Sequence, residues 1–399
     1  MKKQIFLTGI IEFTLLVIGG MVAITEGKID PLQLHKDALV VDMHSDTVLR
    51  MIKGFDFGIR DTSGHMDIPR LQEGGIDLQV FACWLDTRTA KEECRQKVDL
   101  MLDSLDYQIN RYHDKISICL TADDAVRIIN DGKIAAFLAI ENGVAIACDL
   151  SNLDHFYRRG VRYMTLTHTE SSDWCISSAD KKPAFNGLTD FGRDVVRKMN
   201  ELGMIVDISH AAPSAVSEVL KISGDPIIAS HSCVHNHCPH DRNLTDNQIK
   251  AISARGGIIG INFYNAYLSA RWNAISDSVI AAHKEEMDSI AAQFGDDMTG
   301  MHEAMRPIFR EMKPLLKELM IDVDLVVDHI DYIVNLVGPD YVGLGSDFDG
   351  VHALPKNLAD CSMVPNITKE LVNRGYSEED IKKILGGNFM RVFKQVCDN

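Results

Sequence analysis

The chain has 399 residues, of which 46% are hydrophobic and 25% are charged, as expected of a soluble globular protein with a sizeable core. This length suits two or three average domains or one large α/β barrel. The formal net charge of −16 argues against a basic surface for phosphate binding, so we expect no nucleic-acid partner.

The first segment, residues 1–27, has the features of an export signal. Lys2 and Lys3 precede a mostly apolar run, IFLTGIIEFTLLVIGGMVAI. Glu12 interrupts this run, and MVA and AIT are poor cleavage sites. Two interpretations therefore remain open, a cleaved signal peptide and a retained N-terminal membrane anchor. Both predict an exported protein, periplasmic or extracellular, and the second predicts membrane attachment.

Residues 28–399 are predicted to form the working domain. Short apolar or β-branched runs recur along it, each followed by a helix-like stretch. Eight such runs can be identified: ALVVDMH (38–44), IDLQVFACW (76–84), IAAFLAIEN (134–142), VRYMTLTH (161–168), MIVDISH (204–210), PIIASHS (226–232), GIIGINFY (257–264) and YVGLGSDFDG (341–350). Continuous apolar runs suit strands buried on both faces. Eight of them alternating with helices predict a (β/α)8 TIM barrel.

The connecting segments support this interpretation. TDFGRDVVRKMNELG (189–203) is predicted to be a helix that begins after Thr189 and stops at Gly203. Between the seventh and eighth strands, apolar residues at helical spacing predict a helical insertion at about 266–335. Three roles suit such an insertion: a surface addition with its own small core, a lid over the site, or a contact in a homodimer.

Polar side chains stand where the predicted strands end. The first strand ends in His44-Ser45-Asp46, and five others end in Glu141, His168, His210, His231 and Asp347. The carboxyl ends of barrel strands converge on one mouth, where active sites lie. His44 and Asp46, at positions i and i+2, point to the same side of a strand. Histidines combined with carboxylates predict a site for zinc or a similar divalent ion.

The segment IIASHSCVHNHCPHDRN (227–243) is rich in histidine and cysteine. Its spacing is too dense for the usual structural zinc motifs. We therefore assign His231 to the strand end and the remaining histidines and cysteines to the loop that follows. The whole chain has nine cysteines and no CxxC pair, so at least one thiol of an exported protein stays free or pairs between chains.

Several segments together resemble the membrane dipeptidase (renal dipeptidase) family of zinc metallopeptidases, within the amidohydrolase-like barrels. They are VVDMHSDTVL, DIPRLQEGGIDLQVFACW, YMTLTHTESSDW, GMIVDISH, IIASHS, HDRNLTDNQIKAI, VGLGSDFDG and ILGGNFMRVF. These segments follow one another in unbroken order from about residue 38 to residue 393. The resemblance implies a metal-dependent hydrolase that cleaves small dipeptides with a free C-terminal carboxylate, including those with a C-terminal D-residue.

The resemblance also implies a binuclear zinc site with two ions per chain. His44 and Asp46 would bind the first ion, His210 and His231 the second, and Glu141 would bridge them. A shared carboxylate offsets the repulsion between two close cations, and a hydroxide that bridges both metals would be the nucleophile.

Three further residues match family positions with roles toward the substrate. His168 would contact the substrate carbonyl or its oxyanion, Arg242 would bind the C-terminal carboxylate, and Asp347 would carry a proton to the leaving amine. The chain departs from the family at Glu141-Asn142-Gly143, where Glu-Gly-Gly is common. This departure leaves the metal ligand intact and affects the prediction of substrate preference.

Two alternatives remain. The same metal pair could serve an amidohydrolase acting on an N-acyl amino acid, a lactone or a related amide. A non-catalytic homologue is disfavoured because the predicted ligands and Asp347 are all present. A side-chain nucleophile is also disfavoured, since the chain has no GxSxG motif.

Overall fold

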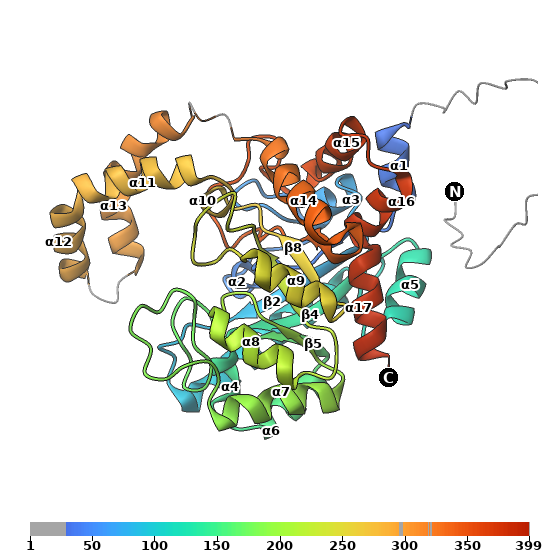
Figure 1. Cartoon of the computed structure of the whole chain (residues 1–399), viewed down its shortest axis with the longest axis horizontal. Helices are drawn as coiled ribbons and strands as arrows, with labels where there is room; N and C mark the ends of the chain where they lie inside the picture. Colours follow the sequence, from blue (N-terminus) through green and yellow to red (C-terminus); the bar gives the residue numbers. More distant parts are fainter. Residues whose placement is uncertain (1–28, 295–297, 318, 320, 399) are drawn as a thin grey trace, which may run out of the picture.

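The computed structural model describes residues 29–398 with gaps at 295–297, 318 and 320 (Figure 1). The predicted signal or anchor, residues 1–27, lies outside the described residues. Among the helices that are described, none has both the length and the apolar character needed to span a bilayer.

Eight parallel strands form the barrel. In spatial order they are β1 (Val41–Asp42), β2 (Leu78–Trp84), β4 (Ile134–Glu141), β5 (Val161–Thr165), β6 (Ile205–Asp207), β7 (Ile228–Ser232), β8 (Ile258–Ile261) and β9 (Val342–Leu344). The circuit closes between β9 and β1, where the Met43 amide donates to the Leu344 carbonyl at 2.9 Å. The predicted (β/α)8 barrel is confirmed, and each predicted run contains one of these strands. A further strand that was not predicted, β3 (Ile116–Ile118), pairs with the start of β4.

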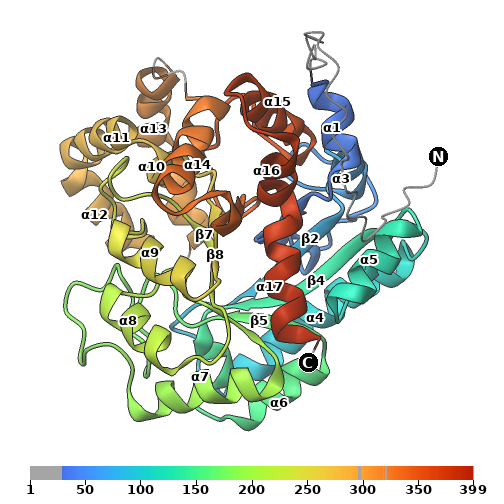
Figure 2. The same ribbon diagram turned by 45° about the vertical axis from the view of Figure 1, so that its right-hand side comes forward.

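Helices surround the barrel (Figures 1 and 2). They are α1 (Pro31–Asp37), α2 (Val48–Met51), α3 (Ile68–Glu73), α4 (Lys91–Arg111), α5 (Ala122–Asn130), α6 (Ser151–Arg158), α7 (Asp190–Leu202), α8 (Pro213–Ile222), α9 (Asp246–Ala254), α15 (Pro365–Asn373), α16 (Glu378–Lys382) and α17 (Asn388–Cys397). Single turns occur at η1 (Gly143–Ile146), η2 (Pro339–Tyr341), η3 (Cys361–Met363) and η4 (Lys383–Gly387). The helix predicted at 189–203 is confirmed as α7: the Thr189 side chain caps it, and Gly203 ends it at φ 71°.

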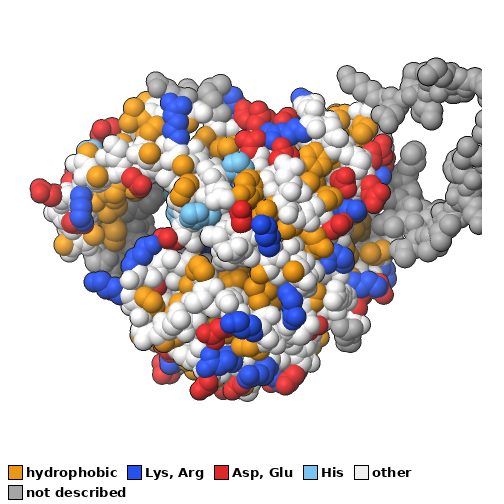
Figure 3. Space-filling model, viewed as in Figure 1, with side chains coloured by type: hydrophobic (Ala, Val, Ile, Leu, Met, Phe, Trp, Pro, Cys, Tyr) orange, Lys and Arg blue, Asp and Glu red, His pale blue; other side chains and the backbone are white. Residues whose placement is uncertain are grey.

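The helical insertion between β8 and β9 is confirmed and has two parts. It comprises α10 (Asn265–Leu268), α11 (Ala270–Ala282), α12 (Lys284–Phe294), α13 (Met298–Lys317) and α14 (Val323–Val337). Helix α14 buries Val326 and Ile330 in the main core. Helices α11 to α13 instead share a small cluster around Val279 and Ile308. They project from the barrel as an arm, with a notch between arm and barrel (Figures 1 and 3).

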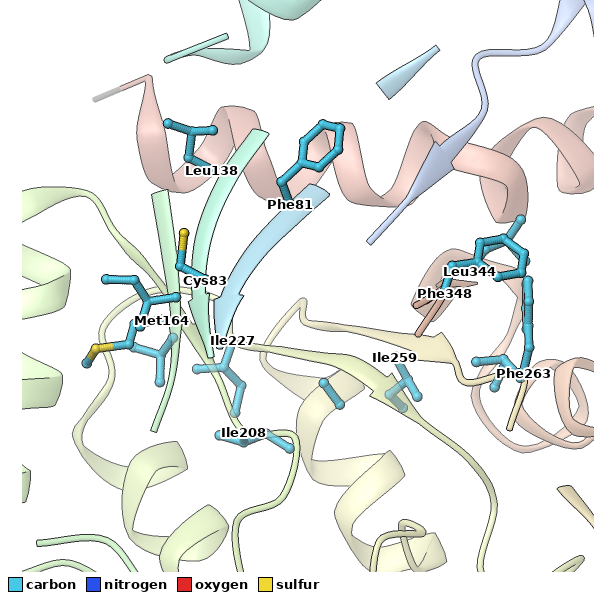
Figure 4. Packing of buried hydrophobic residues seen from close by; sticks show 14 of the residues in the cluster. Phe81, Cys83, Leu138, Met164, Ile208, Ile227, Ile259, Phe263, Leu344 and Phe348 are labelled. Atoms are coloured by element: carbon cyan, nitrogen blue, oxygen red, sulfur yellow. The ribbon is translucent and has the colours of Figure 1, made fainter. Parts of the chain in front are cut away.

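The strands divide the apolar residues between two cores. Along β2, Val80 and Ala82 belong to the cluster inside the barrel. Phe81 and Cys83 alternate with them and belong to the cluster between the strands and the surrounding helices (Figure 4). This alternation is the two-residue period of a strand.

Helix α17 supplies the floor of the barrel. The rings of Phe389 and Phe393 lie with their centroids 5.4 and 4.9 Å from that of Phe137 on β4. All three rings are buried in the interior cluster. The amino end of the barrel is therefore filled by apolar side chains, and polar groups are left to its carboxyl end.

We expect Phe393→Ala to lower the free energy of unfolding by about 3–5 kcal/mol, because it opens a cavity in this floor. Leu100→Ala on α4, where the leucine is 59% exposed, serves as the control and should change stability by about 0.5 kcal/mol or less. Chemical denaturation of both variants measures the difference, and equal losses would contradict the role of α17 as the floor.

Candidate metal centre

Glu141, the last residue of β4, lies among three histidine rings. Its Oε1 is 3.0 Å from His210 Nε2 and 3.3 Å from His231 Nε2. Its Oε2 is 3.4 Å from His44 Nε2. All four side chains are buried, with Glu141 only 2% exposed. The structure thus brings together residues that lie at or just beyond the carboxyl ends of four different strands, as the sequence predicted.

Two aspartates stand on the His44 side of the pocket. Asp46 Oδ2 lies 3.7 Å from His44 Nε2. Asp347 follows β9 in a left-handed conformation, φ 63°, and its Oδ2 accepts a hydrogen bond from Asn262 Nδ2 at 2.8 Å. A Cβ on Gly350 would stand 2.1 Å from Asp46 Oδ2 and 2.5 Å from Asp347 Oδ1. Gly350 therefore leaves both carboxylates the room they occupy, a role that the sequence analysis missed.

His168 lies on the other side of Glu141. Its Nε2 is 3.8 Å from Glu141 Oε1, and its side chain is 21% exposed. The ring meets Trp84, the last residue of β2, edge-on at 5.5 Å and lies 4.2 Å from the His210 ring. Burial lowers the pKa of His168, so the imidazole is neutral at pH 7 and carries one N–H.

Arg242 enters the same end of the barrel from the loop after β7. It is only 4% exposed, and its Nη2 donates to the His231 carbonyl at 3.0 Å. Its guanidinium carbon lies 5.3 Å from the centre of the Tyr267 ring. A buried guanidinium with its Nε unpartnered is suited to an anionic group of a ligand.

The donor atoms form sets that suit metal ions. Three groups each have donor atoms within 4.8 Å of one another: His44, Glu141 and His231; Glu141, His168 and His210; and His44, Asp46 and Asp347. His44 Nε2 and Asp46 Oδ1 are buried without a hydrogen-bond partner. Nitrogen and carboxylate donors of this kind are the ones that zinc prefers. The residues present therefore fit a metal centre that shares Glu141.

The charges of the pocket also favour a cation. Burial, together with the nearby Glu141 carboxylate, raises the pKa of Asp46 to about 8. Burial and the Arg242 guanidinium hold the pKa of His210 well below its usual range. The raised pKa of Asp46 shows that two carboxylates at this spacing repel each other, and a divalent ion held between them would offset that repulsion.

Hydroxyl groups bind the outer nitrogens of two of these histidines. His44 Nδ1 lies 2.8 Å from Tyr163 Oη, and His231 Nδ1 lies 2.7 Å from Ser230 Oγ. Metal-binding histidines generally use their second nitrogen in this way, which fixes the ring. Sequence analysis missed Tyr163 and Ser230, although a polar residue inside an apolar strand was a visible signal for each.

The departure at Asn142 adds contacts to the loop after β4. Asn142 adopts φ 86°, and its Nδ2 donates to the Leu85 carbonyl and to Thr87 Oγ1, both at 2.9 Å. A short polar side chain tolerates this left-handed region better than most residues. The loop is thereby fastened to the segment that follows Trp84.

The histidine-rich loop after His231 makes aromatic contacts. The His237 ring lies 5.1 Å from that of His329 and 5.0 Å from that of Tyr332, and the His240 ring lies 4.8 Å from that of Tyr267. All nine cysteines fall within the described residues, and each is a free thiol.

A parallel barrel whose carboxyl end gathers histidines around a shared carboxylate is typical of metal-dependent hydrolases. Residues 31–399 match the family model described as membrane dipeptidase, peptidase family M19, and the chain belongs to that family. It is accordingly a hydrolase of the metallopeptidase class, which confirms the resemblance found in the sequence.

Individual relatives agree with this assignment. Dipeptidase tcpJ of Claviceps purpurea is 29% identical over 372 residues, which cover 90% of this chain and 77% of the relative. Dipeptidase aclJ of Aspergillus oryzae is 30% identical over 342 residues, covering 84% and 70%. The crystal structure of the probable dipeptidase PvdM from Pseudomonas aeruginosa is similar with a TM-score of 0.77 and 27% identity, covering 92% of this chain and 98% of that one.

Gly350→Ala should displace the carboxylates of Asp46 and Asp347 and reduce bound metal, with little effect on stability because Gly350 lies at the surface. Gly224→Ala is the matched control, since a Cβ there meets nothing within 4 Å. Metal analysis and thermal melting of both proteins test this. A Gly350→Ala protein with full metal content would show that the carboxylates have room to spare.

Proposed function

We propose that the protein hydrolyses the amide bond of small dipeptides and holds two zinc ions bridged by Glu141. His44 and Asp46 bind one ion, and His210 and His231 bind the other. The observation that carries this proposal is the position of the buried Glu141 carboxylate, within 3.4 Å of three histidine Nε2 atoms. When bound, the zinc pair supplies a hydroxide nucleophile at neutral pH and polarises the substrate carbonyl.

His168 stabilises the substrate oxygen on which negative charge develops. Its side chain is partly exposed to the pocket, whereas the proposed zinc ligands are almost completely buried. A neutral imidazole that faces the pocket can donate its one N–H to that oxygen, and a donor in this position stabilises the transition state more than the ground state. The Trp84 ring at 5.5 Å restrains the imidazole.

Arg242 selects substrates with a free C-terminal carboxylate. Its contact with the His231 carbonyl fixes one side of the guanidinium at 3.0 Å from that oxygen, which leaves the remaining N–H groups for the substrate. Because the carboxylate binds beside the metal centre, only a short chain places its amide bond over the nucleophile. The proposal therefore favours dipeptides and includes those with a C-terminal D-residue.

Asp347 carries a proton from the nucleophile to the leaving amine. Asn262 binds its Oδ2 at 2.8 Å, and Oδ1 is the atom closer to Gly350 and the carboxylate of Asp46. One oxygen is thus held by Asn262, and the carboxylate lies with His44 and Asp46 among the possible metal donors. This position suits a group that must accept a proton beside the metal centre and release it again.

Export belongs to the same proposal. Residues 1–27 act as a signal peptide or an N-terminal membrane anchor, and residues 28–399 form the catalytic domain. Cell fractionation of the full chain, compared with a chain lacking residues 1–27, separates secretion from membrane attachment and from retention in the cytosol.

The purified protein should contain close to two zinc equivalents per chain, and Glu141→Ala should lower both because it removes the shared ligand. His237→Ala is the control, since this histidine lies in the loop after His231 and is exposed. Elemental analysis at equal protein concentration gives the comparison. Two full equivalents in Glu141→Ala would rule out the bridge.

Asp347→Asn should keep its fold and most of its zinc while kcat for dipeptides falls by roughly 10²–10⁴-fold, because the amide cannot accept the proton. Asp241→Asn, at a half-exposed loop position that pairs with Lys181, should leave kcat unchanged. A panel of dipeptides, N-acyl amino acids and lactones supplies the substrates. Near-normal turnover by a zinc-loaded Asp347→Asn protein would remove this role, and preference for a lactone or an N-acyl amino acid would replace the proposed substrate class.

A further inference from the structure

Asp207, the last residue of β6, is completely buried and accepts four hydrogen bonds. Its Oδ1 receives the amides of Ser209 at 3.0 Å and Ser230 at 2.8 Å. Its Oδ2 receives the hydroxyls of Thr165 and Ser230, both at 2.6 Å. Both carboxyl oxygens of Asp207 therefore act as acceptors, two donors to each.

The direction of the next hydrogen bond follows from this arrangement. The Ser230 hydroxyl has a single proton, and Asp207 takes it. Ser230 Oγ can therefore only accept from His231 Nδ1, which lies 2.7 Å away. The proton of the neutral imidazole is then on Nδ1, and Nε2 presents its lone pair toward Glu141, 3.3 Å distant.

We infer that Asp207, acting through the Ser230 hydroxyl, is a positioning residue that sets His231 in the tautomer able to bind metal. This inference rests on the proposed role of His231 as a ligand. It gives a reason for a buried acidic side chain whose hydrogen bonds run only to Thr165, Ser209 and Ser230. The hydrogen bonds from His231 Nδ1 through Ser230 Oγ to Asp207 form a relay, and its direction depends on an acceptor at both oxygens of residue 207.

An asparagine at position 207 reverses the relay. Two backbone amides point at the site of Oδ1, so the amide oxygen must occupy it and the NH₂ group must face Ser230. Ser230 Oγ then accepts from the NH₂ group, and its own proton is directed to the nearest acceptor, His231 Nδ1 at 2.7 Å. The other neighbour, Ser209 Oγ, is farther away at 3.3 Å and already accepts the His231 amide. The imidazole proton moves to Nε2, where it blocks the metal.

Asp42 on β1 provides a matched control. It is buried, its Oδ1 accepts the Ser346 amide at 2.8 Å and the His44 amide at 3.5 Å, and its Oδ2 accepts the Ser346 hydroxyl at 2.6 Å and Gln79 Nε2 at 3.0 Å. Ser346 Oγ also approaches the His44 carbonyl at 3.2 Å, and its bonds do not include the ring nitrogens of His44. In Asp42→Asn, the new NH₂ group therefore faces the Ser346 hydroxyl just as that of Asp207→Asn faces the Ser230 hydroxyl. The Ser346 hydroxyl, however, does not contact an imidazole ring.

The test measures Zn²⁺ affinity of the full chain by competition with a chromophoric chelator, together with the melting temperature of each variant. We expect Asp207→Asn to weaken one of the two zinc sites by about 10–100-fold. Ser230→Ala should weaken it by less, because the ring is then free to take either tautomer. Asp42→Asn should lower the melting temperature and weaken zinc binding clearly less than Asp207→Asn does.

The double variant Asp207→Asn with Ser230→Ala gives the sharpest result. Without the hydroxyl the asparagine cannot reverse the relay, so affinity should recover to that of Ser230→Ala alone. A purely structural role for Asp207 predicts that the double variant is at least as impaired as Asp207→Asn, and that result would overturn the inference.

Three further outcomes are decisive. If Asp207→Asn does not fold, Ser230→Thr should retain the affinity that Ser230→Ala loses, and equal affinities in these two variants would overturn the inference. If the wild-type protein binds zinc and Asp207→Asn binds it with the same affinity, the relay is refuted and the proposed function still stands. Wild-type protein that binds no zinc would refute the proposed function and the relay with it.

Discussion

The arrangement of the site depends on one buried carboxylate. Glu141 ends the strand that pairs with β2 over its whole length, from Leu78 opposite Ala135 to Trp84 opposite Glu141. This pairing brings the carboxylate to the carboxyl end of the barrel, above an interior filled by apolar side chains. A carboxylate withdrawn from water is costly unless positive charge and hydrogen-bond donors compensate it. The histidines that converge on Glu141, and the cation that they fit, supply that compensation.

Between the apolar floor and this pocket lies a layer of hydrogen bonds made by Asp42 and Asp207. Asp42 on β1 joins Ser346 beyond β9 to Gln79 on β2. Asp207 on β6 joins Thr165 on β5 to Ser230 on β7. Strands β1, β6 and β9 are only two or three residues long, so few backbone hydrogen bonds restrain their ends. The two carboxylates fasten neighbouring strands at the level from which the site residues project.

Patterns local in sequence predicted the fold and most of the pocket. Each apolar run was recognisable by itself, and the residue that closed it, such as His231 after PIIAS, needed no knowledge of its neighbours in space. Groups that act across strands were missed. Tyr163 meets His44 from 119 positions away, and Gly350 matters only because Asp46 lies beside it. Periodicity assigns a residue to a strand and a face, but it does not give the register that decides which groups meet.

The proposed metal ligands and the loop after Glu141 are held in place in different ways. The proposed ligands lie at or shortly after the carboxyl ends of strands. In the loop after Glu141, Asn142 at φ 86° turns the chain immediately beyond the ligand. Its side chain binds the Leu85 carbonyl and Thr87, directly beyond Trp84. Because Trp84 contacts the His168 ring, the loop after β4 and the ring that is proposed to face the substrate are connected through this short segment. A change at position 142 would therefore alter the surroundings of His168 while Glu141 keeps its place in β4, so the proposed substrate preference can change without a change in the proposed metal ligands.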